Sequence, residues 1–374
     1  MQTGLDRLPD LTDLVTRLRK ERIGLLAHPA SVNAHLVHVL DVLDALDIRP
    51  AVLFGPEHGW AGHAQDMIAV SSVEDTRIVS LYGESFDDLT PKKRDLEGLD
   101  TVVIDLQDVG ARYYTFVWTA VLVARACREA GVRVVVLDRP NPLGSEAIEG
   151  RLQESGYLSF VGLEPIPIRH GLTIAEIVKK HVPEVEVVPF GGNGAPPWVM
   201  PSPNMPTLDT AFVYPGGCLI EGTNLSEGRG TTRPFELVGA PWLDGKRLAR
   251  ALNEAAPALG RGYRARAVTF EPMFHKHARQ QCGGVQIHVT DRNELRSVGL
   301  YVALVAFAHH ARPDQFAFRT ERYEFVDDIP AFDLLTGSSR ARERILAGDD
   351  PIAIAYEIAS IGPHESDIVA SYRR

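Results

Sequence analysis

Short aliphatic runs alternate with amphipathic stretches over the first 150 residues of the chain. The aliphatic runs predict buried strands, and the stretches in which apolar residues recur every three to four positions predict helices. Strands that alternate with helices are typical of a mostly parallel sheet with helices on both faces. The predicted strands are 22–28, 51–54, 77–83, 101–106 and 132–138, and the predicted helices are 34–48 and 115–131. In the second of these helices, Thr115 is placed to cap the start and Gly131 to end it.

Residues 150–235 have a different character, because they are rich in glycine and proline. Aromatic residues such as Trp198, Tyr214 and Phe235 favour ordered loops here rather than disorder. Helix and strand patterns return in 244–256, 283–291 and 298–311. The sequence therefore predicts an α/β fold with a smaller α+β domain packed on the first. We expect the first domain to span 1–232 and the second 233–374.

The composition and the net charge exclude some classes of function. The formal net charge of -10 argues against binding to a nucleic-acid backbone, but it leaves a small neutral or anionic substrate open. The N-terminus lacks the basic start and apolar run of a secretory signal, so the chain as written is expected to be cytoplasmic, or secreted if a signal has been removed. The apolar stretch near residue 300 is too short to insert into a membrane. Cys127, Cys218 and Cys282 form no CxxC pair and are expected to be buried small hydrophobes.

Polar residues follow the predicted strands. In an open parallel sheet, ligands bind outside the carboxyl ends of the strands, so these side chains are expected to share one edge. Glu57 stands out among them because Pro56 and Gly59 restrict the backbone on both sides. For Asp108, and for Arg139 beside Asp138, helix capping or a structural ion pair is an equally good explanation. The candidates at this edge are Glu57, His58, Gln107, Asp108, Arg112, Tyr113, Arg139 and Asn141.

A second dense stretch, EGTNLSEGRGTT, spans 221–232 and supplies Glu221, Asn224, Glu227 and Arg229. It does not match the phosphate-binding loop G-x-x-x-x-G-K-[ST], and no G-x-G-x-x-G follows a predicted strand, so no nucleotide cofactor is expected. HExxH is absent, and the histidines of HGWAGH do not lie on a helix, so no metal site is expected either. No G-x-S-x-G elbow is present for a serine nucleophile. A carboxylate-centred site with histidine and arginine support remains, and this set suits cleavage of a glycosidic bond.

The chain contains, in this order, the motifs LFGPEHG, DLQDVGARYYTF, LDRPNPLG, SFVG, PIPIRHGLT, PSPNMP and YPGGCLIEGTNLSEGRGTTRPFELVGAPW. Their order resembles that of the exo-β-N-acetylmuramidase (NamZ-like) family. The resemblance implies a two-domain protein, with a Rossmann-like first domain that holds no dinucleotide, and removal of terminal N-acetylmuramic acid from the non-reducing end of peptidoglycan chains. It implies that Glu57 is catalytic, that His170 belongs to the site, and that 221–229 lies at the cleft. The chain departs from the family at AHPASV (27–32).

These residues predict Glu57 as the general acid, with Glu221 or Glu227 as the second catalytic group. The acetamido group of the substrate is an alternative nucleophile, in which case the second carboxylate only orients it. An arginine is expected to bind the lactyl carboxylate that distinguishes muramic acid from glucosamine, and the candidates are Arg112, Arg139, Arg169 and Arg229. The expected partner is a peptidoglycan-derived sugar, and the oligomeric state is left open. A non-catalytic cell-wall sugar-binding protein and a hydrolase of another β-N-acetylhexosaminide are the alternatives.

Overall fold

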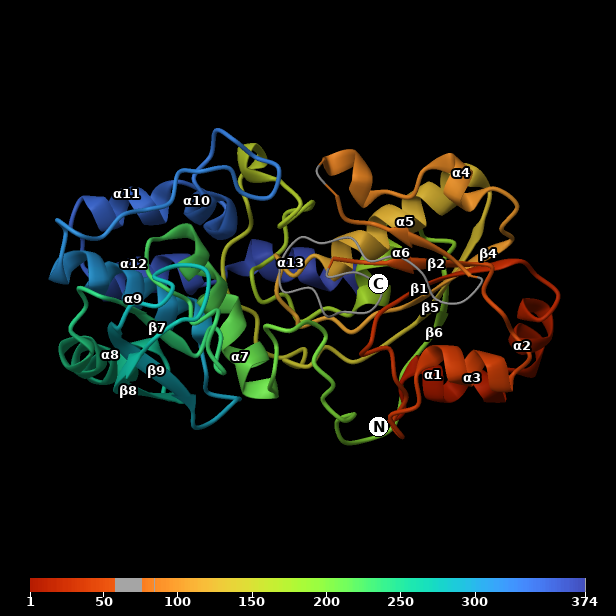
Figure 1. Cartoon of the computed structure of the whole chain (residues 1–374), viewed down its shortest axis with the longest axis horizontal. Coiled ribbons are helices and arrows are strands. Elements are labelled where there is room, and N and C mark those ends of the chain that lie inside the picture. Colours follow the sequence, from red (N-terminus) through yellow and green to blue (C-terminus); the bar gives the residue numbers. More distant parts are fainter. Residues whose placement is uncertain (58–75, 84, 374) are drawn as a thin grey trace.

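A six-stranded parallel sheet forms the centre of one half of the molecule (Figure 1). The computed structural model describes residues 1–57, 76–83 and 85–373. The strand order is β3-β2-β1-β4-β5-β6, and each neighbouring pair is parallel. The order reverses between β1 and β4, which leaves a crevice at the carboxyl edge where the following loops diverge. The strands are β1 (Ile23–Ala27), β2 (Val52–Gly55), β3 (Arg77–Ser80), β4 (Thr101–Asp105), β5 (Arg133–Leu137) and β6 (Glu186–Val188).

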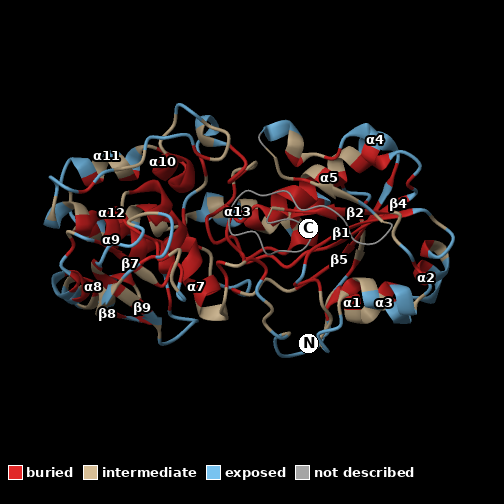
Figure 2. Ribbon diagram, viewed as in Figure 1, coloured by how far each residue is buried: buried red, intermediate tan, exposed pale blue. Residues whose placement is uncertain are grey.

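Helices cover both faces of this sheet because its strands are apolar on both sides. Leu25 and Val103 pack in the core on the side of α1, α2 and α3, whereas Leu26 and Val102 pack in the core that includes α5 and α6. Figure 2 shows the inner strands β1, β2, β4 and β5 largely buried, whereas the edge strands β3 and β6 are partly exposed. The helices are α1 (Gly4–Arg7), α2 (Thr12–Leu18), α3 (Val39–Ala45), α4 (Lys93–Leu96), α5 (Phe116–Ala130) and α6 (Ile174–His181), with 3-10 turns η1 (Leu8–Asp10), η2 (Phe86–Leu89) and η3 (Ser155–Tyr157).

A three-stranded antiparallel sheet and a group of helices form the other half. Its central helix is α9, which is buried continuously from Ser297 to Ala306. The C-terminal helix α13 returns to the first half, where Lys180 of α6 donates a hydrogen bond to Oγ of Ser371 (3.2 Å). The elements are α7 (Leu208–Gly217), η4 (Cys218–Gly222), β7 (Leu237–Ala240), α8 (Gly245–Leu259), β8 (Tyr263–Phe270), β9 (Cys282–Val289), α9 (Ser297–Ala311), α10 (Ala331–Thr336), α11 (Arg340–Leu346), α12 (Pro351–Ala359) and α13 (Pro363–Tyr372).

The predicted fold class is confirmed, and so are the strands and most of the helices expected from the hydrophobic pattern. The helix expected over 34–48 is shorter than predicted, because α3 begins at Val39. Leu36 has a φ of 62°, which a right-handed helix does not allow, and Nδ1 of His38 accepts a hydrogen bond from the amide of Leu40 (3.3 Å). The helix therefore starts where this histidine caps it. The boundary at residues 232 and 233 stays a prediction.

The glycine- and proline-rich stretch contains regular structure that the sequence pattern did not predict. It includes α6, β6 and α7, and α7 ends in Pro215, Gly216 and Gly217. A side chain at Gly216 would place its Cβ about 2.0 Å from the carbonyl oxygen of Ser297, so glycine here permits close packing of α7 on α9. Tertiary packing thus overrides poor helix propensity at this position.

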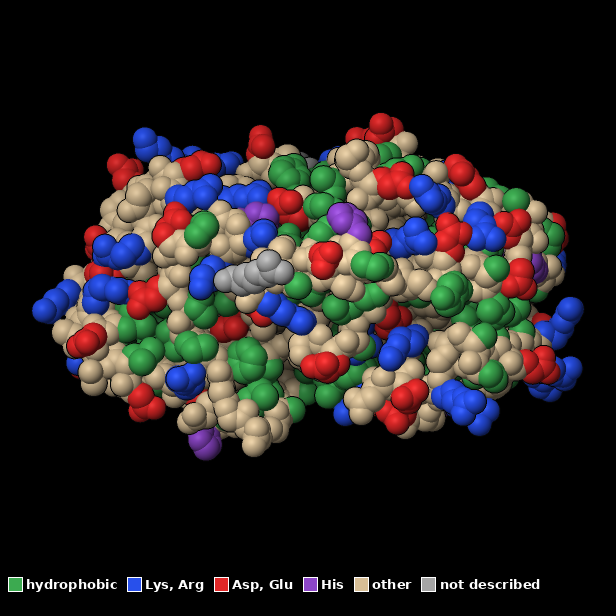
Figure 3. Space-filling model, turned by 180° about the vertical axis from the view of Figure 1, so that it is seen from behind, with side chains coloured by type: hydrophobic (Ala, Val, Ile, Leu, Met, Phe, Trp, Pro, Cys, Tyr) green, Lys and Arg blue, Asp and Glu red, His purple; other side chains and the backbone are tan. Residues whose placement is uncertain are grey.

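The remaining composition-based expectations concern burial and surface charge. All three cysteines are buried, as expected. Within the described residues, no helix is both long and apolar enough to span a bilayer. On the face seen in Figure 3, basic and acidic side chains are interspersed and form no single basic patch.

Candidate functional site

Three carboxylates from distant parts of the chain line one cavity, which we call the carboxylate cavity. Glu57 follows β2, Glu221 lies in η4, and Glu324 lies in the loop between α9 and α10. The cavity therefore joins the edge of the parallel sheet to elements of the other half. The space between its side chains is small, about 50 Å³. Glu57 and Glu221 were predicted from the sequence, whereas Glu324 was not.

Glu57 is partly exposed, at the point where β2 has ended. Its Oε2 accepts a hydrogen bond of 2.6 Å from the hydroxyl of Thr115. Thr115 was expected to cap α5 with its side chain, but that bond is absent, because the hydroxyl is directed to Glu57 instead. The helix start therefore orients a carboxylate at the sheet edge.

Glu221 is held from two sides. Its Oε1 accepts a hydrogen bond from Nη2 of Arg229 (2.6 Å), and its Oε2 accepts one from the hydroxyl of Tyr323 (2.9 Å). The guanidinium of Arg229 also lies over the ring of Phe235, 5.4 Å from its centroid. Both oxygens of Glu221 are thus engaged, which makes this carboxylate a fixed anchor for Arg229 within the cavity.

Glu227 lies outside the cavity lining and has no exposed surface. Its carboxylate is 3.0 Å from Nζ of Lys276, 3.0 Å from Nδ1 of His275 and 3.3 Å from Nε of Arg229. Burial acts to raise the pKa of Glu227, but these neighbours outweigh it and hold the pKa well below its usual range. The group is therefore ionised at neutral pH and compensates buried positive charge.

His170 and Asp108 form a buried pair. Nε2 of His170 is 3.7 Å from Oδ2 of Asp108, and Nδ1 of His170 accepts a hydrogen bond from the amide of Leu172 (3.1 Å). Burial, with a contribution from Arg112, lowers the pKa of His170 to about 3, and burial raises the pKa of Asp108 to about 7. The histidine is therefore neutral at pH 7 and fully enclosed.

Two of the four arginine candidates, Arg112 and Arg169, are buried and line neither the carboxylate cavity nor the molecule's larger cavity. Arg112 donates hydrogen bonds to the carbonyl oxygens of Arg151, Ile166 and Leu335 (2.7–2.9 Å), and so ties together segments far apart in sequence. Arg169 pairs with buried Glu149 at 3.3 Å. Both guanidinium groups are enclosed, so neither faces the carboxylate cavity.

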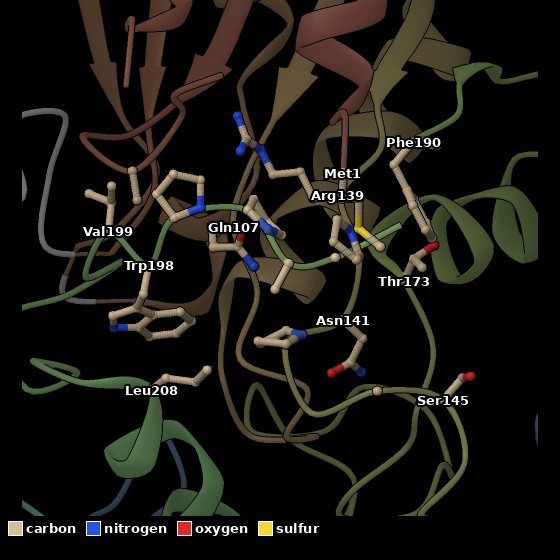
Figure 4. A pocket seen from close by; sticks show the side chains of 18 of the residues that line it. Met1, Gln107, Arg139, Asn141, Ser145, Thr173, Phe190, Trp198, Val199 and Leu208 are labelled. Atoms are coloured by element: carbon tan, nitrogen blue, oxygen red, sulfur yellow. The ribbon is translucent and has the colours of Figure 1, made fainter. Parts of the chain in front are cut away.

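A larger cavity of about 600 Å³ lies at the crevice where the strand order reverses. Gln107, Arg139 and Asn141, three of the residues predicted to bind substrate, line it. Arg139 is engaged by Asp105, to which its Nε (2.5 Å) and Nη2 (2.8 Å) donate. Figure 4 shows Trp198 and Leu208 on one side of this cavity, and Phe190 and Thr173 on the other. Its walls are mainly apolar, with a few amide and hydroxyl groups among them.

Two segments of the chain contribute residues to both cavities. The loop after β4 contributes Gln107 to the larger cavity and Thr115 to the carboxylate cavity. The 194–205 segment does the same, because Trp198 lines the larger cavity and Met205 the carboxylate cavity, with a hydrogen bond from Nε1 of Trp198 to the carbonyl of Met205 (3.2 Å). One site divided into two adjoining parts is consistent with this arrangement.

Of the remaining predicted site residues, one lines the carboxylate cavity and one lies outside it. Tyr113 lines the carboxylate cavity, and its hydroxyl donates to the carbonyl of Pro215. Asn224 lies outside it and bonds the backbone of Gln315 (2.8 Å) and Ala317 (3.0 Å). His58 lies outside the described residues. Within the described part of the chain, no group of three His, Cys, Asp or Glu residues is placed to hold a metal ion.

Sequence reasoning missed Glu324 and the tyrosines around it. Oε2 of Glu324 accepts a hydrogen bond of 3.3 Å from the hydroxyl of Tyr82. Burial raises the pKa of Glu324 to about 8, with further contributions from the negative charges of Glu57 and Glu221. The sequence around it, RYEFVDD, contains no glycine or other motif that marks a site. The recurrence of aromatic residues from Phe316 to Phe325 was the available indication that this loop is packed.

Comparisons with known proteins cover nearly the whole chain. Residues 23–209 match the family model described as exo-beta-N-acetylmuramidase NamZ, N-terminal, and residues 212–361 match its C-terminal counterpart. The chain is 39% identical over 368 residues to a Bacillus subtilis protein named peptidoglycan beta-N-acetylmuramidase NamZ, covering 93% of this chain and 85% of the relative. A crystal structure of a DUF1343 family protein from Bacteroides fragilis superposes with a TM-score of 0.84 at 27% identity, over 99% of this chain and 97% of that one. A second such protein from the same organism gives a TM-score of 0.74 at 25% identity, over 100% and 97%.

Proposed function

Because this chain belongs to the exo-beta-N-acetylmuramidase NamZ family, we propose that it is an exo-acting glycosidase that removes terminal β-linked N-acetylmuramic acid from peptidoglycan fragments. The proposal rests on the carboxylate cavity, where Glu57 of one half and Glu221 and Glu324 of the other lie beside Arg229. Cleavage of a glycosidic bond needs a proton donor and a second group that stabilises the oxocarbenium-like transition state or activates water. Glu57 is the sequence-predicted carboxylate that we propose acts on the sugar.

Arg229 is the arginine that we propose recognises the lactyl carboxylate. Of the four candidates, it is the one that lines the carboxylate cavity. Its Nε and Nη2 face Glu227 and Glu221, and no hydrogen bond from its Nη1 occurs within the described residues. A sugar ring needs more room than about 50 Å³, so we expect groups that line this cavity to move when the substrate binds.

The substrate preference is tested with paired nitrophenyl β-glycosides of N-acetylmuramic acid and N-acetylglucosamine. We expect cleavage of the muramic acid compound and a roughly 10- to 100-fold lower kcat/KM for the glucosamine compound, since the charged hydrogen bond from Arg229 to the lactyl carboxylate, about 1.5–3 kcal/mol, is then missing. Equal cleavage of both would indicate a general β-N-acetylhexosaminidase. Binding of the muramic acid compound without turnover would support the alternative of a sugar-binding protein.

We propose that the larger cavity holds the part of the glycan on the reducing side of the scissile bond. An exo-acting enzyme needs space on that side only, and amide groups beside an aromatic wall suit N-acetylated sugars. Trp198→Ala is expected to lower kcat/KM about 10-fold for a muramic acid glycoside that carries a di- or trisaccharide aglycone, a loss of roughly 1.4 kcal/mol. The nitrophenyl glycoside, which does not fill this cavity, serves as the control and is expected to change less than about 3-fold. Equal losses on both substrates would contradict this placement.

A further inference from the structure

The turn that carries Glu324 has an unusual backbone. Tyr323 and Val326 exchange two hydrogen bonds of 2.9 Å between their backbone amides and carbonyls, so Glu324 and Phe325 form a two-residue turn. The φ angles of these two residues are 44° and 70°. Two consecutive positive φ values are those of a type I′ turn, which strongly favours Asn-Gly. A glutamate followed by a phenylalanine is strained in this conformation by roughly 1–2 kcal/mol per residue.

The side chains of the turn compensate for this strain through contacts on both sides. The ring of Phe325 packs 6.0 Å from the ring of Tyr82 and 6.3 Å from the ring of Phe160, measured between centroids. The hydroxyl of Tyr323 donates to Glu221. The turn is therefore fixed with Glu324 between these two anchors, facing the cavity that Glu57 also lines. Backbone strain that is maintained by surrounding contacts is a feature of functional sites.

Among the residues that the structure describes, Glu324 lacks the cationic partner that a structural buried carboxylate normally has. Within residues 1–57, 76–83 and 85–373, no ion pair to its carboxylate is present. Arg229, the nearest source of positive charge in the cavity, is engaged by Glu221 and Glu227. The hydrogen bond that Glu324 receives comes from a neutral phenol, Tyr82. A carboxyl group in such surroundings is favoured in its protonated form.

We infer that Glu324 is the proton donor of the glycosidic cleavage proposed above, with Glu57 as the second carboxylate across the carboxylate cavity. The proton on Glu324 moves to the glycosidic oxygen as the bond from the anomeric carbon to that oxygen breaks, and the bonding electron pair leaves with the oxygen. The aglycone departs as an alcohol and Glu324 becomes a carboxylate. A water molecule then adds its oxygen to the anomeric carbon and gives its proton to an ionised carboxylate of the pair. Exchange with solvent restores the starting protonation.

The inference rests on the proposed activity and differs from the sequence-based assignment of the proton to Glu57. Both carboxylates line one cavity, and in a catalytic pair of carboxylates the group whose pKa is raised serves as the acid. The raised pKa of Glu324, about 8, keeps its proton in place at neutral pH. The charged and titratable groups that set it are Glu57 and Glu221, which raise it, and Tyr82 and Arg229, which lower it.

Leaving-group dependence tests this assignment. A phenyl glycoside of N-acetylmuramic acid needs protonation of its leaving oxygen, whereas a 2,4-dinitrophenyl glycoside does not. Glu324→Gln is expected to lower kcat/KM at least about 100-fold for the phenyl compound and less than about 5-fold for the dinitrophenyl compound. The matched control is Glu321→Gln, an exposed carboxylate three positions away, which we expect to leave both rates unchanged.

The pH profile supplies a second readout that a purely structural role would not change. With the phenyl compound, wild-type kcat/KM is expected to fall above about pH 8, where Glu324 loses its proton, and Glu324→Gln is expected to lack this fall. Tyr82→Phe removes a hydrogen bond that favours the ionised form of Glu324, so the alkaline limb of this variant is expected to move to higher pH.

Equal losses of kcat/KM on both leaving groups, or an alkaline limb retained in Glu324→Gln, would overturn the inference. A leaving-group-dependent loss in Glu57→Gln would assign the proton to Glu57. No wild-type cleavage of either compound would instead refute the proposed function.

Discussion

Glu57→Gln is expected to retain binding of N-acetylmuramic acid and to turn over its β-glycosides at least about 1,000-fold more slowly than the wild type, whatever the leaving group. The amide has the size of the carboxylate and can still accept the hydrogen bond from Thr115, so the cavity keeps its shape. It cannot carry the negative charge that stabilises developing positive charge at the anomeric carbon, nor accept a proton from water. The loss should therefore appear in kcat rather than in binding.

This experiment needs a control for the general effect of removing a negative charge. Asp87, exposed in η2, provides it, and Asp87→Asn is expected to be fully active. Binding is measured by titration calorimetry with free N-acetylmuramic acid. If Glu57→Gln turned over substrate at the wild-type rate, Glu57 would have no chemical role. If the variant folded but no longer bound the sugar, its role would be recognition.

The sequence predicted the part of the site that depends on local pattern. Buried parallel strands end at the same edge, so the position of Glu57 followed from the run that forms β2. Glu221 and Arg229 were found because glycines and charged residues cluster between 221 and 232. Each of these features is encoded within about a dozen residues, the range over which periodicity and turn chemistry are informative.

What the sequence did not predict depends on contacts between distant segments. Glu324 reaches the cavity because Phe325 packs on Tyr82 and Phe160, a placement that no local rule gives, and its turn contradicts the usual preference for glycine. Conversely, Arg112 stands in a polar motif but is enclosed by three backbone carbonyls from other regions. A sequence motif contains residues that bind a ligand as well as residues that hold the fold together. The tertiary structure is needed to tell the two kinds apart.

Glu227→Gln is expected to lower the free energy of unfolding by roughly 3–4 kcal/mol at pH 7, because it removes the negative member of a buried charge cluster. Gln offers no charge to offset Lys276 and Arg229, and Nζ of Lys276 remains fixed by backbone carbonyls such as that of Ile220 (2.9 Å). The measurement is urea unfolding of the variant and the wild type, with Glu254→Gln on the exposed side of α8 as the matched control. A change below about 1 kcal/mol would mean that water reaches the cluster and screens it.

The same cluster predicts how this difference depends on pH. The pKa of Glu227 is held below its value in the unfolded chain, about 4.3, so its contribution to stability is present in full above that pH and is lost as the pH falls toward the folded-state value. The variant has no such group, so the gap between the wild type and Glu227→Gln should be widest near neutral pH and should narrow below about pH 4. A gap that stays constant down to pH 3 would show that the substitution acts through packing rather than charge.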